Sequence, residues 1–360
     1  MKLPPLKIGE LIASIPIIQG GMGVGVSLST LASAVANEGG IGIISTAQIG
    51  YNEEDFATNA REANKRASRN EIRRARKLSP KGIIGINIMV AMNQYEEIAR
   101  TALEEGIDLI ISGAGLPLNL PKIAKDFKAK LAPIVSSAKA ATVIAKMWDK
   151  KNNCAPDLVV VEGPEAGGHL GFSMESLVEN KAQDLKDIVK EVIEAIKPFE
   201  EKYNKKIPVI AAGGIYTGAD IAEFIKIGAA GVQMATRFVA TEECDASLTY
   251  KMAYINSKKE DIKIVKSPVG MPGRALNNKF MKIVEEKGCK VDKCYLCIKE
   301  CDPKQTPYCI TEALIQAVKG NLDKGLIFVG SNAYKVDKIV TVKELMSELV
   351  TDAEHDLTLP

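Results

Sequence analysis

The stretch IPVIAAGGIYTGADIAEFIKIGAAGVQMATRF, residues 207–238, contains two short apolar runs separated by one amphipathic segment. The runs at 207–212 and 231–236 are too short for helices, and this length together with their Val and Ile content favours buried parallel strands. Residues 219–227, between them, have helical periodicity. A strand, a helix and a second strand in this order form the building block of α/β domains.

The same alternation repeats over the first two thirds of the chain. Eight apolar runs are present, at 15–19, 41–45, 83–89, 107–112, 131–136, 157–162, 207–212 and 231–236. Helices are expected between them, at 29–37, 53–77, 93–105, 138–150, 183–203 and 219–227. Doubly wound sheets share this alternation, but eight runs spaced by about 25 residues favour a closed (β/α)8 barrel, also called a TIM barrel.

After residue 238 the alternation stops. The remainder is predicted to be helical and rich in loops, with a Gly- and Pro-bearing stretch, SPVGMPGRALNNKF, and a group of cysteines. We therefore expect two parts. Residues 1–238 form the barrel, and residues 239–360 form a helical cap that packs back on it and carries a cysteine-rich insertion at about 286–310.

Composition excludes several classes of protein. In 360 residues, 46% are hydrophobic and 26% are charged, which is typical of a globular protein. No apolar run approaches the roughly 20 residues that span a membrane, and the N-terminus lacks a signal-peptide pattern, so we expect no membrane partner and a cytoplasmic location. A net charge of +2 gives no reason to expect a nucleic-acid partner.

One local charge cluster departs from this balance. Residues 61–81 carry nine basic side chains at helical spacing. The favoured interpretation is the solvated face of an outer helix. The alternative is a surface that meets an acidic carrier protein or the phosphates of a cofactor.

The active site of a barrel lies at the C-terminal ends of its strands. These ends carry glycines and small polar residues: Gln19–Gly23, Ser45, Thr46, Asn87, Ser112–Gly115, Ser136, Ser137, Glu162, Gly163, Gly213, Gly214 and Gln233–Thr236. Glycines let the backbone approach a flat ligand, and small polar residues offer single hydrogen bonds to the edge of a heterocycle. A planar cofactor is therefore expected.

Strands seven and eight are where barrels commonly bind phosphate through backbone N–H groups. Here they end in Gly213-Gly214 and in Ala235-Thr236. Such a site needs no lysine or arginine, so a monophosphate such as that of FMN suits it. Arg237 is either an outer partner of the phosphate or a surface charge.

The loop after strand six contains His169, one of two histidines in the chain, directly after Gly167-Gly168. A histidine at this position can titrate near neutral pH and reach a substrate that lies over a cofactor. We therefore predict that His169 is catalytic or binds substrate, with a purely structural role as the alternative.

Several segments resemble one superfamily. EGPEAGGHLG, IPVIAAGGI, GVQMATRF, PIIQGGMG and GINIM are similar to motifs of the nitronate monooxygenase and enoyl-ACP reductase II superfamily, as are SPVGMPGRALNNKF and the closing segment GNLDKGLIFVGSNAYKVDKIVTVKELMSEL. Members of this superfamily are FMN enzymes on α/β barrels. The resemblance covers most of the chain.

The resemblance implies a set of cofactor-binding residues, with His169 as the catalytic or substrate-orienting group. The ring system and ribityl chain of FMN would lie along Gly21, Met22 and Asn87, and the phosphate would lie at strands seven and eight. The full set is Gly21, Met22, Asn87, Glu162, Gly163, Gly168, Gly213, Gly214, Gln233, Ala235, Thr236 and Ser331.

The resemblance implies one of two reactions on a small-molecule substrate. The first is oxidation of alkyl nitronates or nitroalkanes with O2, in which His169 takes a proton beside the nitro group or holds the bound anion. The alternative is NAD(P)H-dependent reduction of an enoyl-ACP or another enoyl thioester, in which His169 orients the carbonyl side. The motifs do not separate the two, and a homodimer is left open.

Two further classes of function were weighed. A flavin barrel acting as a redox sensor or electron carrier stays open. A barrel without flavin, acting as an isomerase or lyase, is disfavoured because no strand end offers a lysine or paired carboxylates.

Five of the seven cysteines fall between Cys289 and Cys309, with the spacing C-x4-C-x2-C-x3-C-x7-C. Such crowding in a reducing compartment favours metal over disulfides. The first three have the spacing of plant-type ferredoxins, and four of them would make a zinc site: Cys294, Cys297, Cys301 and Cys309. The favoured interpretation is nevertheless unligated thiols packed in a small cap subdomain. Cys154 and Cys244 are expected to be buried apolar residues.

Overall fold

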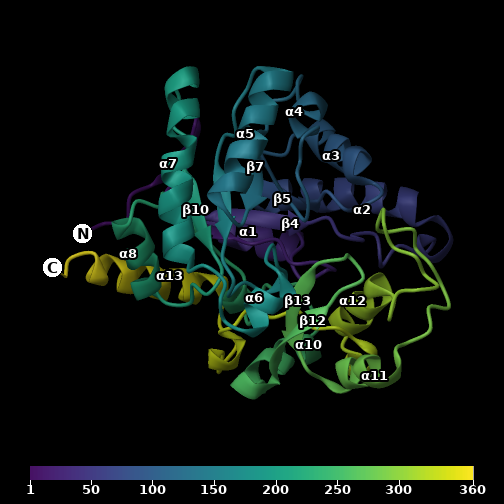
Figure 1. The fold of residues 1–360 in the computed structure, drawn as a ribbon. Coiled ribbons are helices and arrows are strands. Elements are labelled where there is room, and N and C mark those ends of the chain that lie inside the picture. The colour runs from purple at the N-terminus through teal and green to yellow at the C-terminus, as the bar shows by residue number, and fades with distance from the viewer. Residues whose placement is uncertain (360) are drawn as a thin grey trace.

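The computed structural model describes residues 1–359. Its centre is a closed parallel barrel of eight strands (Figure 1). Strand β11 pairs with β3 to complete the ring. The strands are β3 (Ile17–Gln19), β4 (Ile41–Ser45), β5 (Ile83–Met89), β6 (Leu109–Gly113), β7 (Lys130–Val135), β8 (Val159–Glu162), β10 (Val209–Ala212) and β11 (Gly231–Met234). The (β/α)8 barrel is confirmed, and each predicted run coincides with a strand to within two residues at either end.

A helix follows each strand of the barrel. These helices are α1 (Ser29–Asn37), α2 (Phe56–Leu78), α3 (Tyr95–Glu104), α4 (Leu120–Ile123), α5 (Ala138–Asn152), α7 (Leu185–Tyr203), α8 (Gly218–Lys226) and α9 (Thr236–Val239). Local sequence sets their limits: the Thr217 hydroxyl and Asp220 carboxylate form a capping box at the start of α8. Asn204 ends α7 in the left-handed conformation, which asparagine tolerates better than most residues.

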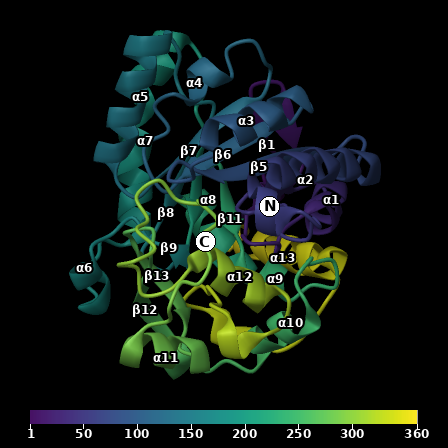
Figure 2. The same cartoon turned by 90° about the vertical axis from the view of Figure 1, so that its right-hand side faces the viewer.

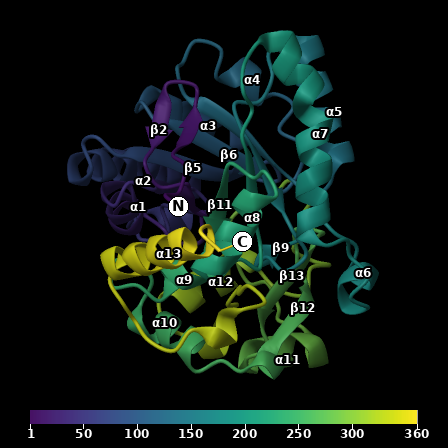
Figure 3. The same cartoon turned by 90° about the vertical axis from the view of Figure 1, so that its left-hand side faces the viewer.

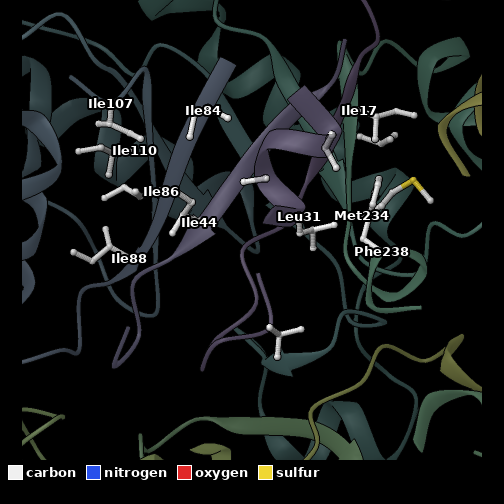
Figure 4. Packing of buried hydrophobic residues seen from close by; sticks show 14 of the residues in the cluster. Ile17, Leu31, Ile44, Ile84, Ile86, Ile88, Ile107, Ile110, Met234 and Phe238 are labelled. Carbon is white, nitrogen blue, oxygen red and sulfur yellow. The ribbon is translucent and has the colours of Figure 1, made fainter. Parts of the chain in front are cut away.

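Side chains on each strand alternate between two apolar layers. Ile43 belongs to the cluster inside the barrel, whereas its neighbour Ile44 packs toward the helices (Figure 4). The inner cluster also contains Leu6 and Ile8 of a hairpin made of β1 (Leu6–Ile8) and β2 (Leu11–Ala13), which was not predicted. Figure 3 shows this hairpin at the end of the barrel away from the cap.

The cap combines helices with a small sheet. Its helices are α10 (Leu248–Ile255), α11 (Lys279–Lys287), α12 (Ile310–Val318) and α13 (Val342–Asp356), together with three 3-10 turns, η1 (Lys259–Asp261), η2 (Leu322–Lys324) and η3 (Ala333–Lys335). Helix α13 returns to pack against α8 and α1 (Figure 2). No helix within residues 1–359 has both the length and the apolar character needed to cross a membrane.

The sheet in the cap was not predicted. It is antiparallel and consists of β12 (Ile262–Lys266), β13 (Pro272–Leu276) and β9 (Gly168–His169). The loop after β8 supplies β9 and the short helix α6 (Met174–Val178), so one segment of the barrel is a strand of the cap's sheet. The Gly- and Pro-bearing stretch is therefore partly a strand rather than only a loop.

Gly42 on β4 tests the contact between barrel and helix. A Cβ atom at this position would lie 1.8 Å from the carbonyl oxygen of Ala32 in α1, so helix and strand meet backbone to backbone. We expect Gly42→Ala to lower the free energy of unfolding by about 3 kcal/mol, as overpacked cores do, measured by urea titration. The control is Gly106→Ala, which adds backbone strain without steric overlap, because Gly106 has a φ of +72° and open space at Cβ. It is expected to lower the free energy of unfolding by about 1 kcal/mol. Equal losses in the two variants would contradict the packing argument.

Candidate active site

A cavity of about 400 Å³ opens at the C-terminal ends of the strands and is closed on its other side by the cap. His169 lines it, together with ten of the twelve residues predicted to bind the cofactor: Gly21, Met22, Asn87, Glu162, Gly168, Gly213, Gly214, Gln233, Ala235 and Thr236. The two exceptions lie just outside the lining. A Cβ at Gly163 would meet Leu185 of α7, and Ser331 donates its N–H to the carbonyl oxygen of Glu165.

The glycines at the end of β10 are required by their backbone geometry. Gly213 and Gly214 have φ values of +96° and +83°, which other residues rarely adopt. A Cβ at Gly213 would also lie 3.0 Å from the backbone nitrogen of Ala166, so this turn packs tightly on the loop that follows β8. The close contact leaves the cavity side of the turn formed by backbone.

An unpaired amide oxygen shows what kind of group suits the cavity. Gln233 Oε1 is buried and has no hydrogen-bond partner within residues 1–359, although buried acceptors are normally paired. Gln233 lines the cavity, whose strand-end side carries glycines and small polar side chains, and no lysine or arginine lines it in the described chain. A flat heterocycle with an N–H edge and a phosphate bound by backbone, as in FMN, fits these residues.

His169 lies on β9, opposite Gly273 of β13. Its Nε2 atom is 2.7 Å from the hydroxyl of Ser267, and its ring meets Phe328 edge-on with 5.0 Å between centroids. Burial lowers the pKa of His169 to about 4, so the imidazole is neutral at pH 7. The His169 side chain is half-buried and lines the cavity.

A cap arginine holds the loop that carries His169. Arg274 on β13 donates from Nη1 to the carbonyl oxygens of Pro164 and Ala166, both at 2.6 Å. Burial lowers the pKa of this guanidinium, although the nearby Glu165 acts in the opposite direction. Neither Ser267 nor Arg274 was identified from sequence. The sequence feature that could have identified them is the SPVGMPGR stretch, which contains both residues and resembles a recurrent cap segment of the superfamily.

Glu162, at the end of β8, is the second titratable group deep in the cavity. Burial raises its pKa to about 8, so the carboxyl group is largely protonated at neutral pH. The same environment therefore keeps both Glu162 and His169 uncharged. Uncharged polar groups of this kind suit hydrogen bonding to a neutral heterocycle.

The cysteine-rich segment docks beside the cavity. The N–H of Asn93 donates to the carbonyl oxygen of Cys297, and Met92 forms an antiparallel bridge with Ile298. All seven cysteines are free thiols, and no group of three or more His, Cys, Asp or Glu side chains within residues 1–359 has a geometry that holds a metal ion. Cys244 is buried and Cys154 is half-buried.

The basic cluster at 61–81 lies on α2, except for Lys81, which follows the helix, and most of its charges are paired. The pairs are Arg61–Glu97, Lys65–Glu62, Arg66–Glu53, Arg66–Asp55, Arg69–Glu104, Arg69–Glu105, Arg73–Glu105 and Arg76–Asp108. The partners come largely from α3 and its neighbouring loops. This pairing supports the interpretation of α2 as a solvated outer helix over that of a docking surface for an acidic partner.

The raised pKa of Glu162 has a measurable consequence. Burial raises the pKa of Glu162 from 4.5, the ordinary value of a glutamate, to about 8, so the folded protein holds this proton up to about pH 8. The stabilising contribution of this proton is therefore complete below about pH 4.5 and is lost as pH rises toward 8. We expect the urea midpoint of the wild type to fall relative to that of Glu162→Gln between pH 5 and pH 8. If the difference in urea midpoint between wild type and Glu162→Gln did not change with pH, the raised pKa of Glu162 would be contradicted.

Comparison with known proteins agrees with this geometry. The sequence model of the family "Nitronate monooxygenase" matches residues 5–352. A probable nitronate monooxygenase of Staphylococcus aureus is 30% identical over 74% of this chain and 76% of its own length. A dehydrogenase of Rhodococcus jostii that acts on a hydroxy-methyl-oxo-octahydroindene-carboxyl-CoA is 26% identical over 94% of this chain and 92% of its own.

A solved structure covers nearly the whole fold. FabK from Thermotoga maritima superposes with a TM-score of 0.72 at 26% identity, over 95% of this chain and 93% of that chain. The barrel, the cap and the closing helix are thus shared along almost the entire length. The chain therefore belongs to the nitronate monooxygenase family, whose members are in general FMN-dependent oxidoreductases.

Proposed function

We propose that this protein oxidises alkyl nitronates or nitroalkanes with O2, as an FMN-dependent monooxygenase. The observation that carries the proposal is a neutral histidine, His169, held by Ser267 at the wall of a cavity whose strand ends suit a flavin. Membership of the nitronate monooxygenase family supports the same assignment.

The residues that would hold FMN divide into two groups. Gly21, Met22 and Asn87 would follow the ring system and ribityl chain, with the remaining contacts from Glu162, Gly163, Gly168, Gln233 and Ser331. Gly213, Gly214, Ala235 and Thr236 would bind the phosphate through backbone N–H groups. When bound, FMN supplies the redox chemistry of the reaction.

His169 would act on the nitro group. Because the imidazole is neutral at pH 7, it can accept a proton from the carbon beside the nitro group or donate a hydrogen bond to a nitro oxygen. Met271, Leu314 and Phe328 line the cap side of the cavity with apolar surface. Such a wall excludes water and suits an alkyl chain.

Reduction of an enoyl thioester with NAD(P)H is the second candidate. It is favoured by the similarity to FabK from Thermotoga maritima over nearly the whole chain, and by the apolar wall, which also suits an acyl chain. His169 would then donate a hydrogen bond to the thioester carbonyl.

The cysteine-rich segment supports a separate proposal, that Cys294, Cys297, Cys301 and Cys309 bind zinc or an iron–sulfur cluster. The N–H of Leu296 donates to the sulfur of Cys294 at 3.4 Å, and hydrogen bonds to sulfur stabilise metal-bound thiolates. Metal binding would require loop 294–309 to tighten around one centre. The free thiols also suit the proposed cytoplasmic location.

Metal analysis of protein purified without oxygen tests this site. We expect about one zinc or several irons per chain, and loss of that metal in Cys294→Ser/Cys297→Ser. The replacement Cys154→Ser is the matched control, because Cys154 lies far from the cluster in sequence and on the barrel. Less than about 0.3 metal per chain would overturn both metal assignments.

Rapid mixing without oxygen separates the two candidate reactions. A nitronate monooxygenase should have its flavin absorbance bleached by an alkyl nitronate alone. Bleaching by NAD(P)H followed by recovery with an enoyl thioester would instead support the reductase.

The variant His169→Ala should keep the yellow flavin but lower turnover by about 10²-fold or more. A loss below about tenfold would show that His169 is not an acid–base group in the reaction.

A further inference from the structure

We propose that Asn332, in the closing segment of the chain, is a positioning residue for the phosphate of the cofactor. It anchors the turn after β10, so that the backbone N–H groups of residues 213–215 are directed to the phosphate. The inference rests on the proposed function. It goes beyond that function because the preference for a phosphate-bearing flavin then depends on a cap residue outside the cavity lining.

The turn after β10 has backbone N–H groups that the protein itself does not use. Residues 213–215 line the cavity and belong to no helix or strand, and their three N–H groups have no hydrogen-bond acceptor within residues 1–359. The next two N–H groups, of Tyr216 and Thr217, both donate to the carboxylate of Asp220. Backbone N–H groups are normally paired, so the first three are the donors that this turn offers to a bound phosphate.

Asn332 anchors the turn through one carbonyl group. Its Nδ2 atom donates to the carbonyl oxygen of Gly214 at 2.7 Å. The peptide unit that joins Gly214 to Ile215 is trans, and the C=O and N–H of a trans unit point in opposite directions. Asn332 lies outside the cavity lining and Ile215 lies within it, so the carbonyl points to the cap while the N–H of Ile215 points the other way.

Two successive glycines make such an anchor important. Gly213 and Gly214 have φ values of +96° and +83°, and glycine backbone can rotate between many conformations. Gly213 packs tightly on Ala166, because a Cβ atom there would lie 3.0 Å from the backbone nitrogen of Ala166. The carbonyl of Gly214 is instead held by the hydrogen bond from Asn332, so loss of that bond frees the second half of the turn.

The segment that carries Asn332 is itself tied to the barrel. The N–H of Ser331 donates to the carbonyl oxygen of Glu165 at 3.1 Å, and its hydroxyl donates to Glu165 Oε2 at 3.2 Å. A Cβ atom at Gly330 would lie 2.6 Å from Thr236 Oγ1, at the start of α9. Residues 330–332 therefore contact both halves of the proposed phosphate site, the turn after β10 and the start of α9.

No cationic side chain takes the place of the backbone donors. The guanidinium of Arg237 donates to the carbonyl oxygen of Tyr216 at 3.1 Å and pairs with Glu348 of α13 at 2.8 Å. Arg237 is not in the lining, and neither is any other arginine or any lysine of residues 1–359. Hydrogen bonds weaken when their angle departs from linear, so binding of a phosphate by N–H groups alone depends on how the turn is held.

Flavin binding to the purified protein without cofactor tests the role of Asn332. The variant Asn332→Leu keeps a side chain of similar size and removes the donor. We expect its Kd for FMN to rise about tenfold, and its Kd for riboflavin to change by less than about twofold. Asn321→Ala is the matched control, because it removes a cap amide that donates to Gln316 on the surface. It should leave both Kd values unchanged.

The ratio of the two Kd values separates positioning of the phosphate from general damage to the cavity. Equal losses of affinity for FMN and riboflavin in Asn332→Leu would overturn the inference, and so would an unchanged Kd for FMN. In both cases the wild type still binds FMN and the proposed function stands. A wild type that binds neither flavin would overturn the proposed function and this inference together.

Hydrogen exchange of the wild type and of Asn332→Leu gives a second measurement. We expect FMN to slow amide exchange in residues 330–336 of the wild type, and riboflavin at equal saturation to leave exchange there unchanged. In Asn332→Leu, this difference between the two flavins should be lost. Equal protection of residues 330–336 by FMN and riboflavin in the wild type would contradict the link between the phosphate and the closing segment.

Discussion

The pairing of β9 with β13 is the interaction on which the candidate active site depends. Through it, Gly168 and His169 of the barrel lie opposite Arg274 and Gly273 of the cap. Arg274 then fixes the loop before β9, and Ser267, directly after β12, hydrogen-bonds to the imidazole. The loop that carries His169 is thereby held from both sides, so its geometry depends on barrel and cap together.

The cavity combines this support with an uncharged interior. Burial acts in opposite directions on the pKa of an acid and of a base, and here it makes both Glu162 and His169 neutral near pH 7. The glycines and small polar side chains at the strand ends add polarity without net charge, and Glu165 adds a carboxyl group to the lining. A neutral flavin ring and a substrate whose charge is stabilised by hydrogen bonds are suited to such a site.

Much of the barrel was predictable because its signals are local. Strand runs such as 41–45 and 83–89 match β4 and β5 to the residue, since a parallel strand buried on both faces is a continuous apolar run. Glycines and small polar residues at the strand ends likewise identified about half of the cavity lining, on its barrel side. The position of a residue within its βα unit was enough to assign it to a strand or to the cavity.

The support of the site was not predictable from such signals. His169 and Ser267 are 98 residues apart in sequence, and no local pattern shows that they meet. The strands β12 and β13 flank a Gly- and Pro-bearing turn and resemble a loop in sequence, and the hairpin β1–β2 is too short to show a period. Their pairing partners, distant in the chain, decide their structure.

The central claim is that the glycine-lined barrel mouth is a flavin site. Titration of the purified chain with FMN, followed by flavin absorbance and fluorescence, tests it most directly. We expect one FMN per chain, bound tightly enough to survive gel filtration. An excess of riboflavin should not displace it, because the phosphate of FMN supplies part of the binding energy. A colourless protein that does not bind added FMN would contradict the account.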